Sequence, residues 1–264
     1  MTKKSPLISV IMNACNSEKY LNECLKSLKR QSYKKWELIF FNNCSSDKTL
    51  EILKKSKIKN LKYFYSKKKL KLYHARNFAL RKAKGDYITF LDTDDKWKFD
   101  KLKKQINFFY RNKDCRILYS NYFVFDMNKK IKFIKHKSLL PKGRITDNLL
   151  ENYVIAILTV MIDRNLFSKN RFNQNYEIIG DFDLLLKLSR KFKIGVMQEP
   201  LAYYRVHNDN SSKKLSIYKN ELINWISKNE KNLISSGHNL FHLKYYLFKI
   251  RLKNFISSLL NMGV

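Results

Sequence analysis

The first ninety residues of the chain alternate between short apolar runs and segments in which apolar residues recur at helical spacing. The apolar runs LISVIM, WELIFF, LKYFY and YITFL cover residues 7–12, 36–41, 61–65 and 87–91. The helical segments between them cover residues 20–31, 47–57 and 74–84. Parallel strands need a crossover connection, which is usually a helix. The alternation therefore predicts an α/β fold with a doubly wound, mostly parallel sheet and helices on both faces.

The pattern continues less regularly after residue 97. Helices are expected at about residues 99–112 and at 181–192. Three more strands are expected, at residues 116–125, at 131–136 as a hairpin partner of the former, and at 155–162 as a buried strand. The chain has only 3 Pro and 6 Gly and no low-complexity linker. The simplest division is one large domain at residues 1–213, followed by a helical extension at residues 214–264.

The extension ends in NLFHLKYYLFKIRLKNFISSLLNMGV, residues 239–264, which mixes Leu, Phe, Tyr and Ile with Lys and Arg. This composition is typical of a basic amphipathic helix. Such a helix can lie in a membrane interface against anionic lipid. The alternative is a C-terminal helix that packs on the domain and leaves its lysines in solvent, and the sequence leaves both open.

The chain carries 54 Lys+Arg against 22 Asp+Glu, a formal net charge of +32. This charge suits nucleic acid, an anionic membrane surface or a phosphate-bearing substrate, and it equally suits a merely lysine-rich composition. The four cysteines, Cys15, Cys24, Cys44 and Cys115, show no metal-ligand spacing and predict reduced, mostly buried thiols in a cytoplasmic protein. No apolar run reaches the length of about 18 residues that a membrane helix requires.

Polar residues follow three of the predicted strands at the ends where ligands bind in doubly wound sheets. NACN (13–16) and NNCSSD (42–47) suit a heterocycle and a ribose, whereas DTDD (92–95) places three carboxylates behind a buried strand. Carboxylates so close repel one another unless a cation or hydrogen-bond donors hold them. Oxygen ligands at this position suit Mg²⁺ or Mn²⁺ bridging phosphates, and the layout predicts a nucleoside-diphosphate site.

Three stretches together resemble glycosyltransferase family 2, the inverting group with the GT-A fold. They are SVIMNACNSEKYLNECLKSLKRQSYKKWELIFFNNCSSDKT, HARNFALRKAKGDYITFLDTDDKW, and GDFDLLLKL with QEPLAYYRVH. The resemblance runs in order from about residue 7 to residue 210, some four-fifths of the chain. It implies a GT-A catalytic domain at residues 1–213, with a nucleotide-sugar half at about 1–97 and an acceptor half at about 98–213.

The resemblance also implies roles for individual residues. The family's DxD motif falls on Asp92, Asp94 and Asp95, which would hold a divalent ion and the donor. The implied metal ligands are Asp94, Asp92 and His207, with Mn²⁺ or Mg²⁺ as the ion. The other implied nucleotide-sugar contacts are Asn13, Ala14, Asn16, Asn42, Asn43, Arg76 and Arg205. NACN replaces the usual PTYN, and Asn42 replaces the usual Asp, so the base is not fixed; turn-forming asparagines are the alternative.

The motif GDFD (180–183) implies the catalytic base. The family usually has Glu-Asp here, with the Asp as general base, so that Asp181 takes this role and Gly180 is a departure. Asp183 is a lesser candidate. The alternative for Asp181 is a plain helix cap, which would have a lowered pKa.

The resemblance implies an enzyme that transfers one sugar from a nucleoside-diphosphate sugar, with a UDP-sugar as the expected donor, to a glycan or lipid-linked glycan acceptor. A bacterial surface glycan made at the cytoplasmic face of the inner membrane would match the basic helix, with the enzyme peripheral on an anionic membrane surface. A non-catalytic sugar-nucleotide-binding protein is the first alternative. A nucleic-acid-binding protein is the second, and it is disfavoured because no recognised motif supports it and the aspartates would face a polyanion.

Overall fold

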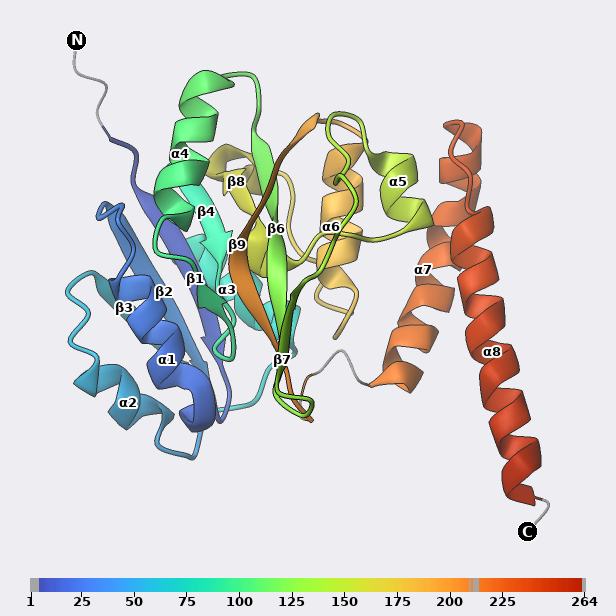
Figure 1. Cartoon of the computed structure of the whole chain (residues 1–264), viewed down its shortest axis with the longest axis horizontal. Helices are drawn as coiled ribbons and strands as arrows, with labels where there is room; N and C mark the ends of the chain where they lie inside the picture. Colours follow the sequence, from blue (N-terminus) through green and yellow to red (C-terminus); the bar gives the residue numbers. More distant parts are fainter. Residues whose placement is uncertain (1–4, 209, 211–213, 263–264) are drawn as a thin grey trace.

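One mixed β-sheet runs through the body of the protein, and helices pack on both of its faces (Figure 1). The structure is a computed structural model that describes residues 5–208, 210 and 214–262, with side chains through Ile250 and at Leu252. The strands are β1 Ile8–Ala14, β2 Trp36–Asn43, β3 Leu61–Ser66, β4 Tyr87–Phe90, β5 Lys96–Trp97, β6 Ile117–Asp126, β7 Ile131–Ile134, β8 Met161–Asp163 and β9 Ile194–Val206. The helices are α1 Glu18–Lys29, α2 Thr49–Lys55, α3 Leu72–Lys82, α4 Lys101–Arg111, α5 Thr146–Glu151, α6 Gly180–Ser189, α7 Leu215–Ser235 and α8 Phe241–Met262, with short 3-10 turns η1 Ile157–Thr159 and η2 Arg164–Ser168.

The sheet order is β3-β2-β1-β4-β8-β6-β9-β5, and β7 pairs with β6 outside this path. The first four strands are parallel, as the alternation predicts. Ala14 lies opposite Asn42, and Ile11 lies opposite Phe90, so the ends of β1, β2 and β4 meet at one edge. The second half mixes parallel and antiparallel pairs. The predicted α/β fold and the hairpin of β6 with β7 are confirmed.

Two apolar cores form on the two faces of the sheet because the parallel strands are apolar on both sides. Helices α1, α2 and α4 cover one face with side chains such as Leu21, Leu53 and Leu102. Helices α3, α6, α7 and α8 cover the other, where Leu185 and Trp225 belong to one continuous cluster. The helical extension after residue 213 therefore shares a core with the large domain.

The prediction of a continuous strand at residues 155–162 is wrong. Residues Ile157–Thr159 form the turn η1, and only Met161–Asp163 form strand β8. The carbonyl groups in this stretch bind side chains from other elements: that of Leu158 accepts from Trp97 Nε1 at 2.9 Å, and that of Thr159 accepts from Gln105 Nε2 at 2.7 Å. These side chains replace the neighbouring strand as hydrogen-bond partners, which allows an apolar segment to turn.

Strand β9 is the main element that the apolar pattern does not predict. It is 13 residues long and pairs in parallel with the whole of β6, with a register shift where Asn121 lies opposite Pro200. It also pairs with the short β5, where Trp97 lies opposite Ala202. Because β5 comes directly after the aspartate loop, this pairing places the end of β9 beside Asp94 and Asp95. Strand β9 thus connects the two motifs that carry the predicted metal ligands.

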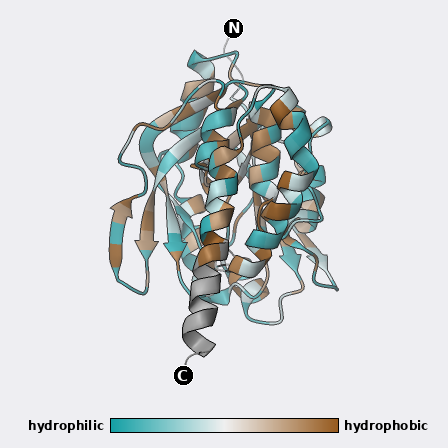
Figure 2. Ribbon diagram, turned by 90° about the vertical axis from the view of Figure 1, so that its right-hand side faces the viewer, coloured by the Kyte–Doolittle hydropathy of each residue, from teal (hydrophilic) through white to brown (hydrophobic). Residues whose placement is uncertain are grey.

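Helix α8 uses one side to pack on the protein and exposes the other. Leu243, Leu247 and Ile250 are buried in the core cluster or at its margin. Figure 2 views the molecule onto this helix, where apolar and polar residues alternate along the ribbon. Its exposed residues include Phe241, Tyr245, Tyr246, Phe248 and Leu252. Within the residues that the structure describes, no helix has both the length and the apolar character to cross a membrane.

All four cysteines are free thiols. Only Cys24 is buried, whereas Cys15, Cys44 and Cys115 are half-buried. The expectation that most of them are buried is therefore wrong. Cys15 and Cys44 lie in the turns that follow β1 and β2 rather than within the strands.

Candidate functional site

The carboxyl ends of β1 and β4 open into a cavity of about 470 Å³. The aspartate loop forms one side of it, and the start of α6 forms another. Eight of the residues predicted from the sequence line this cavity: Asn13, Asn16, Arg76, Asp92, Asp94, Asp95, Asp181 and His207. They come from segments up to 194 residues apart in the chain, and the sheet topology brings them together.

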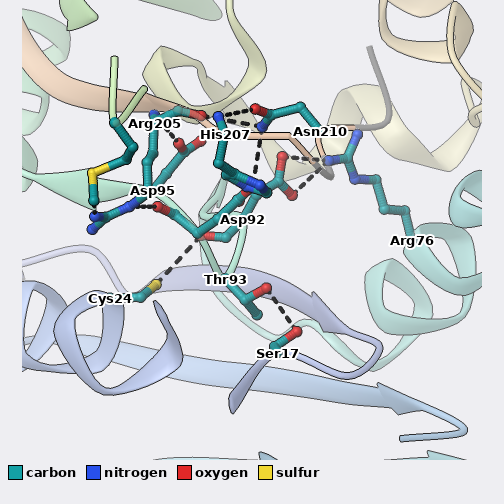
Figure 3. Close-up of polar contacts among 11 residues, drawn as sticks. Ser17, Cys24, Arg76, Asp92, Thr93, Asp95, Arg205, His207 and Asn210 are labelled. Atoms are coloured by element: carbon teal, nitrogen blue, oxygen red, sulfur yellow. Dashed lines mark hydrogen bonds and ion pairs between the residues drawn. The ribbon is translucent and has the colours of Figure 1, made fainter. Parts of the chain in front are cut away.

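The three aspartates of the DTDD loop have different partners (Figure 3). The guanidinium group of Arg76 donates to both carboxylate oxygens of Asp92, at 2.7 and 2.9 Å. Asp94 Oδ2 lies 2.9 Å from His207 Nε2. Asp95 is buried, and its Oδ1 accepts the backbone N–H of Arg205 at 2.9 Å. Hydrogen bonds thus reduce the repulsion at Asp92 and Asp95, and Asp94 is held through a histidine.

Burial raises the pKa of the Asp94 carboxyl, and the charge of Asp92 raises it further, while the hydrogen bond with His207 opposes both. Burial and the two neighbouring carboxylates raise the pKa of Asp95 well above its usual range. A divalent cation would counter this repulsion, because it favours the ionised form of both groups.

Asp94 and His207 fit a divalent ion best among the predicted ligands. Their facing atoms, a carboxylate oxygen and an imidazole nitrogen, are ligands that Mn²⁺ accepts, and both residues line the cavity. Asp92 is held on both oxygens by Arg76 and would have to share one of them. Within the described part of the chain, no group of three or more His, Cys, Asp or Glu side chains is arranged around a common ion position. A site here would need donor oxygens, such as those of a diphosphate, to complete its coordination.

Asn13 and Asn16, at the end of β1, both line the cavity, but their side chains differ in hydrogen bonding. Asn16 has a positive φ of 50°, and its Oδ1 accepts the backbone N–H of Ser46 at 2.9 Å, so it joins the turns after β1 and β2. Both polar atoms of the Asn13 amide are buried and have no hydrogen-bond partner among the described residues. Because an unpaired buried amide is costly, Asn13 is the residue on this side that most needs a ligand.

Four predicted contacts do not line the cavity: Ala14, Asn42, Asn43 and Arg205. The Asn43 amide binds the backbone of Leu70 through both its oxygen and its nitrogen, each at 2.8 Å. Asn42 accepts from Ser45 N and donates to Tyr63 Oη. Ala14 is buried in the core on the α1 side. In the structure these side chains shape the loops around the cavity.

Arg205 points away from the cavity. Its Nε donates to the carbonyl of Asp94 at 2.8 Å, and its Nη2 donates to Glu23 at 2.9 Å. The guanidinium also lies over the ring of Tyr20, 4.5 Å from the centroid. Arg205 thus fastens the aspartate loop to α1, in contrast to the diphosphate contact that the resemblance implies.

Asp181 stands at the start of α6 and lines the same cavity as the aspartate loop. Its Oδ1 accepts from Tyr73 Oη at 2.8 Å and from its own helix at Phe182 N, 3.2 Å. The residue is half-buried by surface area because one edge faces the cavity, but protein surrounds the carboxyl densely elsewhere. This burial raises the pKa of Asp181, although Arg76 and Tyr73 act in the opposite direction. A simple helix cap would show a lowered pKa, so the raised pKa of Asp181 differs from what a cap alone would give.

Asp183, the lesser candidate for the base, is buried on the other side of α6. Its Oδ1 accepts from Trp225 Nε1 at 2.9 Å, and its Oδ2 pairs with Lys187 at 2.7 Å. It is not among the residues that line the cavity. The structure assigns this carboxylate to the packing of α6 against α7.

Among the cavity residues that were not predicted from the sequence are Tyr73 and Asn210, although each lies close to a recognised motif. Tyr73 immediately precedes HARN, and Asn210 follows YRVH. Asn210 Nδ2 lies 3.4 Å from Asp94 Oδ2, and Asn210 Oδ1 accepts His207 N. Residues three and four apart lie on the same face of a helix, so Tyr73 shares a face with Arg76 and Asn77. This spacing could have predicted Tyr73 from the sequence.

The chain matches the model of glycosyl transferase family 2 over residues 9–179. A relative in Bacillus subtilis, named as the teichuronic acid biosynthesis glycosyltransferase TuaG, is 37% identical over 217 residues, 80% of this chain and 84% of that protein. WfgD of Escherichia coli, named as a UDP-Glc:alpha-D-GlcNAc-diphosphoundecaprenol beta-1,3-glucosyltransferase, is 36% identical over 63% of this chain and 64% of its own length.

Solved structures show the same fold. Residues 1–349 of TarS from S. aureus, in complex with UDP-GlcNAc, superpose with a TM-score of 0.65 at 20% identity, over 83% of this chain and 66% of that one. The mannosyltransferase PcManGT from Pyrobaculum calidifontis, in complex with GDP-Man and Mn2+, gives a TM-score of 0.64 at 15% identity, over 87% of this chain and 65% of that one. The protein spans about two thirds of the length of these structures. Family match, sequence relatives and architecture agree: the chain belongs to glycosyltransferase family 2 and is an enzyme with the GT-A fold.

Proposed function

We propose that this protein is a metal-dependent, inverting glycosyltransferase that moves one sugar from a nucleoside-diphosphate sugar to a hydroxyl of a growing bacterial surface glycan. The observation that carries the proposal is that Asp94, His207 and Asp181 line a single cavity, with Asp94 hydrogen-bonded to His207. Asp94 and His207 suit the leaving diphosphate, and Asp181 suits the attacking hydroxyl. A single in-line displacement between them inverts the anomeric carbon.

Asp181 is the general base in this proposal. Its raised pKa makes it a better proton acceptor than an exposed carboxylate, and it faces the cavity. The acceptor hydroxyl gives its proton to this carboxylate as its oxygen attacks the anomeric carbon. Asp94 and His207 would hold the ion, which when bound offsets the charge on the departing diphosphate. Asn13 would receive polar groups of the base or ribose, because its amide has no partner among the described residues.

The donor is proposed to be a UDP-sugar and the acceptor a glycan or lipid-linked glycan. WfgD is named for transfer from UDP-Glc to a diphosphoundecaprenol-linked sugar, and TarS binds UDP-GlcNAc. Either acceptor carries hydroxyl groups, which Asp181 would deprotonate in the cavity. The ion is proposed to be Mn²⁺ or Mg²⁺, with Mn²⁺ favoured by the imidazole of His207.

The test measures nucleotide release from UDP-glucose, UDP-N-acetylglucosamine and GDP-mannose, with Mn²⁺ and with chelator. We expect Mn²⁺-dependent release by the parent and a fall of at least about a hundredfold in Asp94→Ala, since loss of outer-sphere partners alone costs up to that much. The matched control is Asp114→Ala, which removes an exposed carboxylate in the loop after α4. Equal turnover by Asp94→Ala and the parent would contradict the metal assignment, and donor binding without turnover would favour a non-catalytic sugar-nucleotide-binding protein.

We further propose that the exposed side of α8 contacts an anionic membrane surface, which would make the enzyme peripheral on the cytoplasmic face. Phe241 and Phe248 are 62% and 58% exposed, and Lys249 Nζ lies 4.5 Å from the ring centroid of Tyr245. Exposed aromatics beside lysines suit the lipid interface, and the charge of +32 suits anionic headgroups.

Because the inner side of α8 belongs to the core, point substitutions test the membrane proposal better than a truncation. Phe241→Ser with Phe248→Ser should reduce sedimentation with phosphatidylglycerol vesicles and leave the fold intact. The control is Tyr65→Ser on β3, which removes a similarly exposed aromatic side chain far from α8 in the sequence. Unchanged sedimentation of the double variant would refute the contact.

A further inference from the structure

Tyr73 and Gly180 are in contact directly beside the carboxylate of Asp181. Tyr73 is the second residue of α3 and is only 1% exposed. Its ring stacks on Phe172 at a centroid distance of 5.3 Å, and the guanidinium of Arg76 lies 5.5 Å from its centre. These contacts fix the ring, so the hydroxyl has a defined position at the cavity wall.

The hydroxyl of Tyr73 lies between two oxygens of the loop that starts α6. It is 2.6 Å from the carbonyl of Ile178 and 2.8 Å from Asp181 Oδ1. The hydroxyl has one proton and both neighbours accept, so the proton favours the ionised carboxylate, where the bond is charge-assisted. Burial beside Asp181 raises the pKa of Tyr73 well above its usual range, so the phenol keeps that proton.

Gly180 provides the space that the ring occupies. A Cβ at residue 180 would lie 2.5 Å from Cδ2 and Cε2 of Tyr73, a distance that real Cβ atoms do not show. The ring therefore packs directly against the Gly180 backbone, and any larger residue would displace it. The absence of a side chain at 180 and the presence of Tyr at 73 are two parts of one arrangement.

The loop itself is held from the other side by α7. The carboxylate of Glu221 accepts the backbone N–H groups of Ile178 and Ile179, at 2.9 and 3.1 Å. Gly180 thus contacts Tyr73, and Glu221 binds the backbone of Ile178 and Ile179. One oxygen of the Asp181 carboxyl is held by Tyr73, and the other makes no hydrogen bond to the described residues.

We propose that Tyr73 is the positioning residue of the Asp181 base, and that Gly180 is the residue that admits it. By holding Oδ1, the phenol fixes the rotation of the carboxyl group so that Oδ2 receives the proton of the attacking hydroxyl. The proposal rests on the proposed function, because it deepens the role given there to Asp181.

The experiment compares the full-length parent with Tyr73→Phe, which keeps the ring and removes only the hydroxyl. The assay follows UDP release from UDP-glucose and UDP-N-acetylglucosamine with Mn²⁺, as a function of pH. We expect kcat to fall roughly tenfold to hundredfold, as for other misplaced catalytic groups. The KM for the donor should stay the same, and the acid limb of the pH profile should move to higher pH because the carboxylate loses a donor.

Tyr153→Phe is the matched control. Tyr153 also carries a buried hydroxyl near α6, where its ring meets Phe182, but that hydroxyl has no hydrogen-bond partner among the described residues. This variant should keep the parental kcat and pH profile. Gly180→Ala should lower kcat in the same way as Tyr73→Phe, and it should add little in the Tyr73→Phe background, where the hydroxyl is already absent.

A second measurement does not depend on turnover. In protein labelled with [¹³C]aspartate, the carboxyl resonance of Asp181, identified by its loss in Asp181→Asn, should titrate at higher pH in Tyr73→Phe than in the parent. An unchanged titration and an unchanged pH profile in Tyr73→Phe would overturn the proposal. If Asp181→Asn is inactive in that case, the proposed function stands without it; if Asp181→Asn turns over like the parent, the base assignment fails and this proposal fails with it.

Discussion

Replacing Asp181 by Asn should reduce transfer and, at neutral pH, increase stability. The Asn amide keeps an oxygen that can accept from Tyr73 and removes the negative charge. Loss of a general base costs about 10² to 10⁴ in rate, which corresponds to about 2.7 to 5.5 kcal/mol of transition-state stabilisation. The assay is Mn²⁺-dependent UDP release at saturating donor.

The stability effect has a definite sign with pH. Burial raises the pKa of Asp181 above its usual value of 3.8, so the folded protein binds more protons than the unfolded chain between that value and the folded pKa. The parent therefore loses stability as pH rises through this window, and Asp181→Asn does not. The variant should be the more stable protein at pH 8, and its advantage should shrink towards pH 4.

Urea unfolding of both proteins at a series of pH values measures this difference. For each unit by which folding raises the pKa of Asp181, the free energy of unfolding of the variant should exceed that of the parent by a further increment of about 1.4 kcal/mol, at pH values above the folded pKa. A change in the urea midpoint at constant slope shows that stability alone has changed. Parallel stability curves for the two proteins would refute the idea that a costly buried charge is kept at this position, and parental turnover by Asp181→Asn would refute its role as base.

Three other changes test separate contacts. Arg76→Lys replaces a guanidinium whose Nη2 holds both oxygens of Asp92, and it should destabilise the fold by about 2 kcal/mol or more in urea unfolding, since a Lys ammonium cannot lie over the Tyr73 ring as a planar guanidinium does. Burial lowers the pKa of Lys101 well below its usual value, so the folded protein binds fewer protons than the unfolded chain. The parent should become more stable as pH rises towards 10.5, and Lys101→Met should show no such rise. Trp225→Phe removes the donor to buried Asp183 and should cost about 1.5 to 3 kcal/mol, measured as a lower Tm; no change would mean that α7 is not part of the cooperative unit.

The strands and helices of the first ninety residues could be predicted because their signals are local. A run such as LISVIM can only be buried on both sides, and the spacing of Leu21, Leu25 and Leu28 defines one helical face, which the structure buries. The aspartates of DTDD could also be placed, because the end of a buried parallel strand is fixed once the strand is known. These features depend on residues within one or two turns of each other.

The elements that were missed or misjudged depend on distant partners. Strand β9 contains Gly195 and Pro200, and only its pairing with β6 makes it a strand. The turn at Ile157–Thr159 depends on Trp97 and Gln105, which supply its hydrogen bonds from other elements. No pattern within an apolar segment can show which side chains will reach its backbone.

Local patterns in the sequence were enough to predict the α/β fold and the family, together with the motifs that carry the proposed catalysis. The direction of each side chain depends on the folded arrangement. It turns Arg205 from the cavity towards Glu23, joins Asp94 to His207, and places Tyr73 in the space that Gly180 leaves. The physical reason is that a motif fixes which residues follow a strand, whereas hydrogen bonds and packing between elements far apart in the chain fix where those residues point.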